Sequence, residues 1–141
     1  MRLFLDTSVL LAASGSATGA SREVFRLAPK NAWTLIATPY AIEETRRNLS
    51  HFPASALTDW NHLRGNLLLM HDVFTVDRPA VFAPAKDRPI LFSALAWADV
   101  LLTLDRGDFE MLFGGEFYGL AILTPGRFLM RERSARRLIS E

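Results

Sequence analysis

The sequence predicts a single α/β domain of three layers (α/β/α), in which helices cover both faces of a mainly parallel sheet. Short and almost wholly apolar segments recur along the chain, and segments with helical spacing separate them. Such alternation is typical of βαβ units. Strands that are apolar throughout, such as VLLTL at 100–104, are typical of a sheet buried on both faces. The 141 residues suit one domain, 1–141.

In the first half of the chain the elements follow from apolar spacing and helix-start signals. The apolar run Leu3–Leu5 predicts a strand, and Val9–Ala13 predicts a helix after it. Ser21 stands in an N-cap position before apolar residues at helical spacing. Proline is favoured in the first turn of a helix, so a further helix is expected to begin at Pro39. The remaining predictions are strands at 33–37 and 73–76 and a helix over 53–70.

The second half is expected to contain a buried helix and two more strands. Asp87 stands in an N-cap position before residues 88–98, which are apolar on most sides of a helix and therefore suit a place between layers. The apolar segments 100–104 and 119–123 predict strands. A basic helix is expected to begin near Pro125.

Composition excludes some kinds of site. The chain has no cysteine, which excludes disulfides, zinc–thiolate sites and thiol nucleophiles. Its net charge of +1 does not indicate nucleic acid, although 14 of its 16 basic residues are Arg, the residue suited to bidentate phosphate contacts. No apolar run reaches membrane-spanning length, and the amino-terminal residues lack a signal-peptide pattern, so we expect a cytoplasmic protein without a membrane partner.

Two carboxylates follow two of the predicted strands. Asp6 comes after the first strand and Asp105 after the strand at 100–104. The carboxyl ends of parallel strands meet at one edge of a sheet, where ligands bind in such folds. Two ionised carboxylates about 4 Å apart repel each other by roughly 4 kcal/mol at an effective dielectric of 20. Such a pair requires either a cation or a shared proton.

A third carboxylate is selected by helical projection. In the helix after Pro39, Glu44 lies at the border of the buried stripe, whereas Glu43 points almost directly away from it. Glu44 is therefore the acid expected to reach the edge of the sheet.

Each acid also has a purely structural explanation. Asp6, Asp87 and Asp105 suit helix caps, Asp108 suits an Asx turn, and Glu44 suits a solvated helix face. The coincidence of four acids, two of them at strand ends, favours a joint site. All-oxygen ligands without His or Cys suit Mg²⁺ or Mn²⁺.

Four segments of the chain share the order and spacing of a known family, namely LFLDTSVLLAA, AIEETRRNL, KDRPILFSALAWADVLLTLDRGDF and GLAILTPGRFL. Together they resemble the PIN domain, and within it the toxin-type (VapC-like) ribonucleases of bacterial toxin–antitoxin pairs. The resemblance covers almost the whole chain except residues 50–80.

This resemblance implies metal-dependent hydrolysis of RNA phosphodiester bonds, with Mg²⁺ or Mn²⁺ as the cofactor. The implied catalytic residues are Asp6, Glu44, Asp87 and Asp105, of which Asp6, Asp87 and Asp105 would hold the metal. The implied supporting residues are Thr7, Asp99, Thr103 and Asp108. RNA is the implied substrate and an antitoxin protein the implied partner, with a homodimer by analogy. Three arginines near the acids in sequence suit steering of RNA phosphates, namely Arg46, Arg47 and Arg106.

Two other functional classes share features of this sequence. A haloacid-dehalogenase-type phosphatase also begins with a strand that ends in Asp, but it needs a second Asp at the position of Ser8. A non-catalytic PIN-fold module that binds RNA or protein is the other alternative, and binding of Mn²⁺ would separate it from an enzyme. The carboxyl-terminal segment RFLMRERSARRLISE is compatible with RNA contact, with partner docking and with a solvated helix end.

Overall fold

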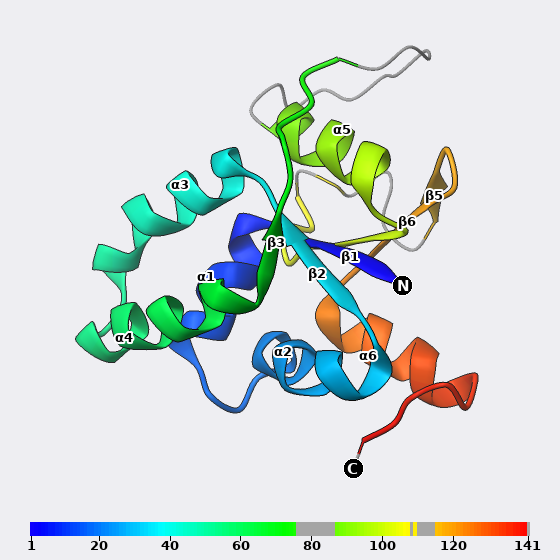
Figure 1. Ribbon diagram of the computed structural model, residues 1–141, viewed down its shortest axis with the longest axis horizontal. Helices are drawn as coiled ribbons and strands as arrows, with labels where there is room; N and C mark the ends of the chain where they lie inside the picture. Colours follow the sequence, from blue (N-terminus) through cyan, green and yellow to red (C-terminus); the bar gives the residue numbers. More distant parts are fainter. Residues whose placement is uncertain (76–86, 108, 110–114, 141) are drawn as a thin grey trace.

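The computed structural model describes residues 1–75, 87–107, 109 and 115–140, and these residues form one six-stranded sheet (Figure 1). The strand order is β3-β2-β1-β4-β6-β5. All neighbouring pairs are parallel except β5 with β6. This confirms the predicted fold class. The strands are β1 (Arg2–Leu5), β2 (Thr34–Ala37), β3 (Leu67–Leu69), β4 (Val100–Leu102), β5 (Glu116–Phe117) and β6 (Leu120–Leu123).

Helices cover both faces of this sheet. Figure 1 shows α2 and α6 side by side on one side of the sheet and α5 on the other, and α5 packs against β1 and β4. Three helices carry proline in the first turn, as expected from its fixed φ. The helices are α1 (Thr7–Gly15), α2 (Ala20–Asn31), α3 (Pro39–Asn48), α4 (Ala54–Leu63), α5 (Arg88–Trp97) and α6 (Pro125–Ser134), with short 3₁₀ turns η1 (Leu49–His51) and η2 (Arg64–Asn66).

The core lies around the central strands. Leu3–Leu5 of β1 are fully buried, as are Leu101 and Leu102 of β4. A strand covered on both faces has no solvent side, which explains why these segments are apolar at every position. No helix in the described part of the chain is long and apolar enough to cross a membrane.

Two predicted boundaries in the middle of the chain are wrong. The helix expected over 53–70 ends at Leu63, and the third strand is Leu67–Leu69 instead of 73–76. The leucines at 67–69 continue the apolar spacing of the preceding helix, so periodicity alone does not separate the two elements. Residues 73–75 form no strand, and residue 76 lies outside the described residues.

Two smaller details also differ from the prediction. Helix α2 begins at Ala20 with Gly19 at the N-cap, and Ser21 is buried in the first turn instead of capping it. The two-residue strand β5 was not predicted, because it is too short to give an alternating pattern.

Strand direction determines where polar side chains meet. Asp6, Thr38 and Thr103 each directly follow the carboxyl end of a parallel strand. Helix α5 returns the chain from this edge to the start of β4, so Asp87, at its N-cap position, lies at the same edge. The topology thus places several sequence-distant polar residues at one end of the sheet.

The amino end of α3 is held by a residue from another segment. Thr38 occupies the N-cap position, but its side chain makes no capping hydrogen bond. Instead, the backbone N–H of Tyr40 donates to Asp72 Oδ2 at 3.0 Å. The next residue is also anchored, since the N–H of Val73 donates to Ser93 Oγ of α5 at 2.8 Å. Asp72 therefore caps α3 across the fold.

Replacing this cap tests its contribution to stability. We expect Asp72→Ala to lower the free energy of unfolding by about 1 kcal/mol, the usual cost of losing a helix N-cap. Asp72→Asn keeps an oxygen acceptor and is expected to lose less. Urea unfolding followed by circular dichroism measures both values. Equal stabilities for Asp72→Ala and the wild type would contradict the capping role.

Candidate active site

Asp6 is the most deeply buried carboxylate at the carboxyl edge of the sheet, with 5% of its surface exposed. It is the N-cap of α1, where its Oδ1 accepts a hydrogen bond from the Thr7 N–H at 2.7 Å. Its Oδ2 accepts two more, from Thr103 Oγ1 at 2.7 Å and from Ser8 Oγ at 3.0 Å. The capping explanation is therefore correct but accounts for only one of the three bonds.

The two hydroxyls that hold Asp6 also connect the ends of β1 and β4. Ser8 Oγ accepts the backbone N–H of Leu104 at 3.0 Å, and Thr103 Oγ1 accepts that of Asp105 at 3.0 Å. Thr103, which the resemblance implies as a supporting residue, thus contacts Asp6 directly. Sequence reasoning missed Ser8, although its place two residues after the carboxylate was the available signal.

The electrostatics of Asp6 are unfavourable to its ionised form. Burial raises the pKa of the Asp6 carboxyl above its ordinary value, and the nearby charge of Glu44 raises the pKa further. The hydrogen bonds from Thr103, Ser8 and Thr7 act in the opposite direction, but burial is the largest effect. A cation at this position would relieve the unfavourable charge.

Glu44 is connected to Asp6 through Thr7, whose backbone N–H donates to Asp6 and whose hydroxyl donates to Glu44. Thr7 Oγ1 donates to Glu44 Oε1 at 3.1 Å, which links α1 to α3. Its neighbour Glu43 is exposed and forms an ion pair with Arg46 at 2.6 Å. The helical projection that separated Glu44 from Glu43 is therefore confirmed.

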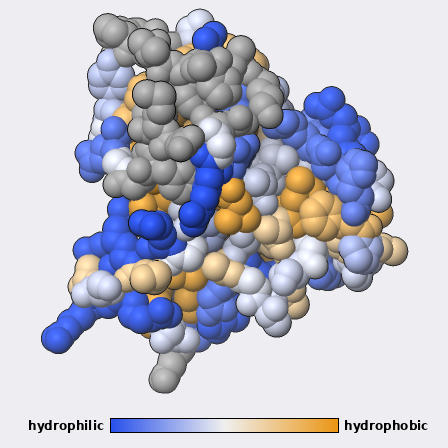
Figure 2. All heavy atoms as spheres, turned by 180° about the vertical axis from the view of Figure 1, so that it is seen from behind, coloured by the Kyte–Doolittle hydropathy of each residue, from blue (hydrophilic) through white to orange (hydrophobic). Residues whose placement is uncertain are grey.

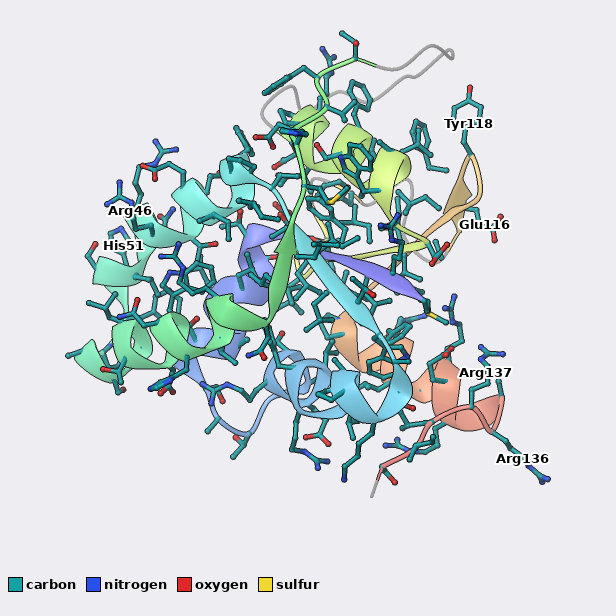
Figure 3. The ribbon with its side chains drawn as sticks, viewed as in Figure 1. Arg46, His51, Glu116, Tyr118, Arg136 and Arg137 are labelled. Carbon is teal, nitrogen blue, oxygen red and sulfur yellow. The ribbon has the colours of Figure 1, made fainter. Side chains whose placement is uncertain are left out.

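The arginines expected to bind substrate lie on exposed surface. Figure 3 shows Arg46 pointing away from the sheet on the outer side of α3, where it pairs with Glu43. Arg47 lies 3.8 Å from the same carboxylate. Arg106 is exposed beside Asp105, beyond the end of β4. Of the three, Arg106 lies nearest in sequence to the residues that hold Asp6.

Two further predicted acids lie at this edge. Asp87 is 8% exposed at the N-cap position of α5. Asp105 is partly buried, and its backbone N–H donates to the Thr103 hydroxyl that in turn donates to Asp6. Within the residues that the structure describes, no three His, Cys, Asp or Glu side chains form a group that could hold a metal ion. The structure thus brings Asp6 and Glu44 together most closely, and Asp108 lies outside the described residues.

The supporting role expected for Asp99 requires correction. Asp99 precedes β4, so it lies at the amino end of the strand, about 10 Å from the other end for three residues. There its Oδ2 accepts the backbone N–H of Arg2 at 2.7 Å, and its own N–H donates to the Arg2 carbonyl at 2.9 Å. Asp99 joins the starts of β1 and β4 and does not support the acids.

The donor set at Asp6 and Glu44 fits a hard divalent cation in kind. A carboxylate has about four acceptor positions. Among the described residues, hydrogen bonds use two on Asp6 Oδ2, one on Asp6 Oδ1 and one on Glu44 Oε1. Oxygen positions on both residues therefore remain for a cation. Mg²⁺ is commonly bound by one or two carboxylates, with waters and substrate phosphates as its other ligands.

Comparison with known proteins supports the fold. No protein-family model matches the sequence, and no curated protein sequence matches it. Among solved structures, a chain of the crystal structure of VapBC2 from Rickettsia felis, bound to a DNA fragment from their promoter, is similar with a TM-score of 0.60 and 14% identity. This match covers 86% of the present chain and 97% of that chain. Mycobacterium tuberculosis VapC20, a sarcin–ricin loop cleaving toxin, gives a TM-score of 0.45 and 19% identity, with 77% and 93% covered.

The likeness to the Rickettsia felis structure extends over nearly all of that chain. The protein therefore shares the PIN-like α/β/α fold of this VapBC2 chain, as the sequence resemblance implies.

The pH dependence of stability tests the buried charge of Asp6. Because folding raises the pKa of Asp6, the stability from this group is present below its ordinary pKa and is lost as pH rises through the raised value. Asp6→Asn removes that loss. In chelator we therefore expect the variant to melt higher than the wild type near neutral pH, with the advantage disappearing in acid.

Thermal unfolding followed by circular dichroism at a series of pH values measures this difference. Asn offers only one acceptor oxygen, so the pH dependence of the difference is the deciding quantity. A difference in melting temperature between the variant and the wild type that stays the same at every pH would show that Asp6 carries no unfavourable buried charge.

Proposed function

We propose that the protein is a divalent-metal-dependent endoribonuclease and that it acts as the toxin of a toxin–antitoxin pair. One observation carries the proposal: a buried carboxylate, Asp6, is fixed by three hydrogen bonds beside Glu44 at the carboxyl edge of a parallel sheet. This edge is where ligands bind in α/β folds. A pair of acids kept close there, one of them buried, is expected where a cation is part of the function.

Asp6 and Glu44 would hold Mg²⁺ or Mn²⁺, and waters and substrate phosphates would complete its coordination. Asp87 and Asp105 lie at the same edge of the sheet and would add negative charge near the ion. When bound, the ion would lower the pKa of a water and offset charge that develops on the phosphate. Thr103 and Ser8 fix the orientation of the Asp6 carboxylate, and Thr7 fixes that of Glu44. Arg106 stands exposed beside Asp105 and would attract the RNA phosphates to an otherwise acidic edge.

The antitoxin part of the proposal rests on the fold. The similar chain belongs to a structure of a VapBC2 assembly bound to DNA from its promoter. A protein with the same fold and an acidic site at the sheet edge is a candidate for the same kind of pairing. A non-catalytic module, by contrast, has no need of a buried carboxylate whose charge is left unfavourable.

The nuclease proposal is tested by cleavage of RNA by the purified protein. We expect cleavage with Mg²⁺ or Mn²⁺ and none after chelation. Cleavage that persists in chelator would contradict the metal-dependent mechanism.

The pair Glu43 and Glu44 provides a matched test on one helix. Glu44→Gln should lower the cleavage rate by about 100-fold or more, since even the partners of metal ligands typically contribute about 10- to 100-fold. Glu43→Gln removes the same charge from an exposed side chain paired with Arg46 and should leave the rate nearly unchanged. The measurement is a single-turnover cleavage assay, with circular dichroism to confirm folding. Loss of activity in Glu43→Gln alone would place the site elsewhere.

A further inference from the structure

A groove lies beside α6, outside the group of acids described above. Its volume is about 490 Å³, and its lining residues are Leu123, Arg127, Met130, Arg131 and Ser134. Leu123 ends β6, and the other four occupy one side of α6 at helical spacing. The groove therefore begins at the carboxyl end of β6 and runs along α6.

The charge of this groove is positive. Within the described residues Arg127 forms no ion pair, and it is exposed. Arg131 lies 3.4 Å from Glu132, but that buried acid is already bound more closely by Arg137 at 2.7 Å. The hydrogen bond from Arg137 is also the main reason why the pKa of Glu132 is lowered. Two guanidinium groups thus line the groove. Arg131 shares Glu132 with Arg137 and also lies over the Phe128 ring, 5.5 Å from its centroid. Figure 2 shows hydrophilic residues gathered where the carboxyl-terminal segment lies, at the lower left.

Leu123, which lines the groove, is connected to Asp6 by two hydrogen bonds of Thr103. The N–H of Thr103 donates to the carbonyl of Leu123 at 3.0 Å, and the Thr103 hydroxyl donates to Asp6. One lining residue is therefore separated from Asp6 by a single residue of the neighbouring strand. Because β6 runs parallel to β4, its last residue, Leu123, lies at the same edge of the sheet as the acids, and the groove begins there.

The lining chemistry matches an RNA strand. Arg binds phosphate through paired N–H donors, and the two arginines lie one turn apart on the same helix. Met130 between them is 63% exposed and offers an apolar, polarisable contact for a base or ribose. A polyanion with apolar bases satisfies both features.

We propose that the groove formed by Leu123, Arg127, Met130, Arg131 and Ser134 binds the RNA strand that extends from the acidic site. This inference rests on the proposed ribonuclease function and adds a binding surface to it. Arg127 and Arg131 contact successive phosphates, and Met130 contacts the nucleoside between them. The site holds substrate and takes no part in bond cleavage.

The test separates binding from cleavage. A fluorescent single-stranded RNA is titrated, in chelator and at several salt concentrations, with Glu44→Gln protein and with the same protein carrying Arg127→Gln and Arg131→Gln. We expect the two added changes to weaken RNA binding at least tenfold at low salt. The slope of the logarithm of the binding constant against the logarithm of the salt concentration should become shallower by about 1.4, because each phosphate contact on a single strand contributes about 0.7. Thermal unfolding confirms that all proteins are folded.

A matched control comes from the end of the same segment. Arg136→Gln removes the same charge from a side chain that points away from the molecule beyond α6 (Figure 3), and it is expected to leave affinity and slope nearly unchanged. Three results would overturn the proposal. RNA affinity could be unchanged by the Arg127→Gln and Arg131→Gln changes together, Arg136→Gln could weaken binding equally, or the Glu44→Gln protein could fail to bind RNA at low salt. Arginine-dependent binding of poly-glutamate without arginine-dependent binding of RNA would also overturn it, since that result would assign the groove to an acidic protein segment.

These outcomes remain distinct from failure of the proposed nuclease. If the protein binds RNA through Arg127 and Arg131 but never cleaves it, the RNA-binding groove is supported and the nuclease proposal is contradicted. If the wild type cleaves RNA with metal, but the Arg127→Gln and Arg131→Gln changes leave RNA affinity as it was, the nuclease proposal is supported and the RNA-binding groove is contradicted.

Discussion

The carboxylate of Asp6 lies where β1, α1 and β4 meet, and its hydrogen bonds depend on these elements being in place. Its donors come from the first turn of α1 and from the residue after β4, and the adjacent Glu44 belongs to α3. A buried carboxylate without such donors would be costly. The hydroxyls of Ser8 and Thr103 reduce that cost without removing the charge, so the site stays folded and still favours a cation.

Parallel topology explains why residues so distant in sequence converge. Because β1, β2 and β4 run in one direction, the segments that follow them begin at the same edge, and α5 returns the chain so that Asp87 lies there too. The backbone hydrogen bond between Thr103 and Leu123 joins the end of β4 to the end of β6, so this edge of the sheet also includes β6 and the start of α6. Catalysis and substrate binding, as proposed, therefore use one continuous edge, with acids above the central strands and arginines on the helix beside them.

Local patterns predicted the parts of the structure that local physics controls. Apolar strands, the prolines in the first turns of helices and the helical projection of Glu44 all follow from a few neighbouring residues, and the structure confirms them. The errors arose where tertiary contacts decide. The leucines at 67–69 become a strand because β2 pairs with them, and Asp72 caps α3 from a distant segment. Asp99 was assigned by resemblance, whereas strand direction puts it at the opposite edge. The hydroxyl of Ser8 gains its role only through Leu104 and Asp6.

The central claim is that Asp6 and Glu44 together form a cation site. Titration of the metal-free protein with Mn²⁺, followed by the loss of the free-ion electron paramagnetic resonance signal, tests it without requiring RNA or turnover. The account predicts a saturable Mn²⁺ site in the wild type and in Glu43→Gln, and a large loss of affinity in both Asp6→Asn and Glu44→Gln. Equal Mn²⁺ affinity in all four proteins, or no saturable binding in the wild type, would contradict it.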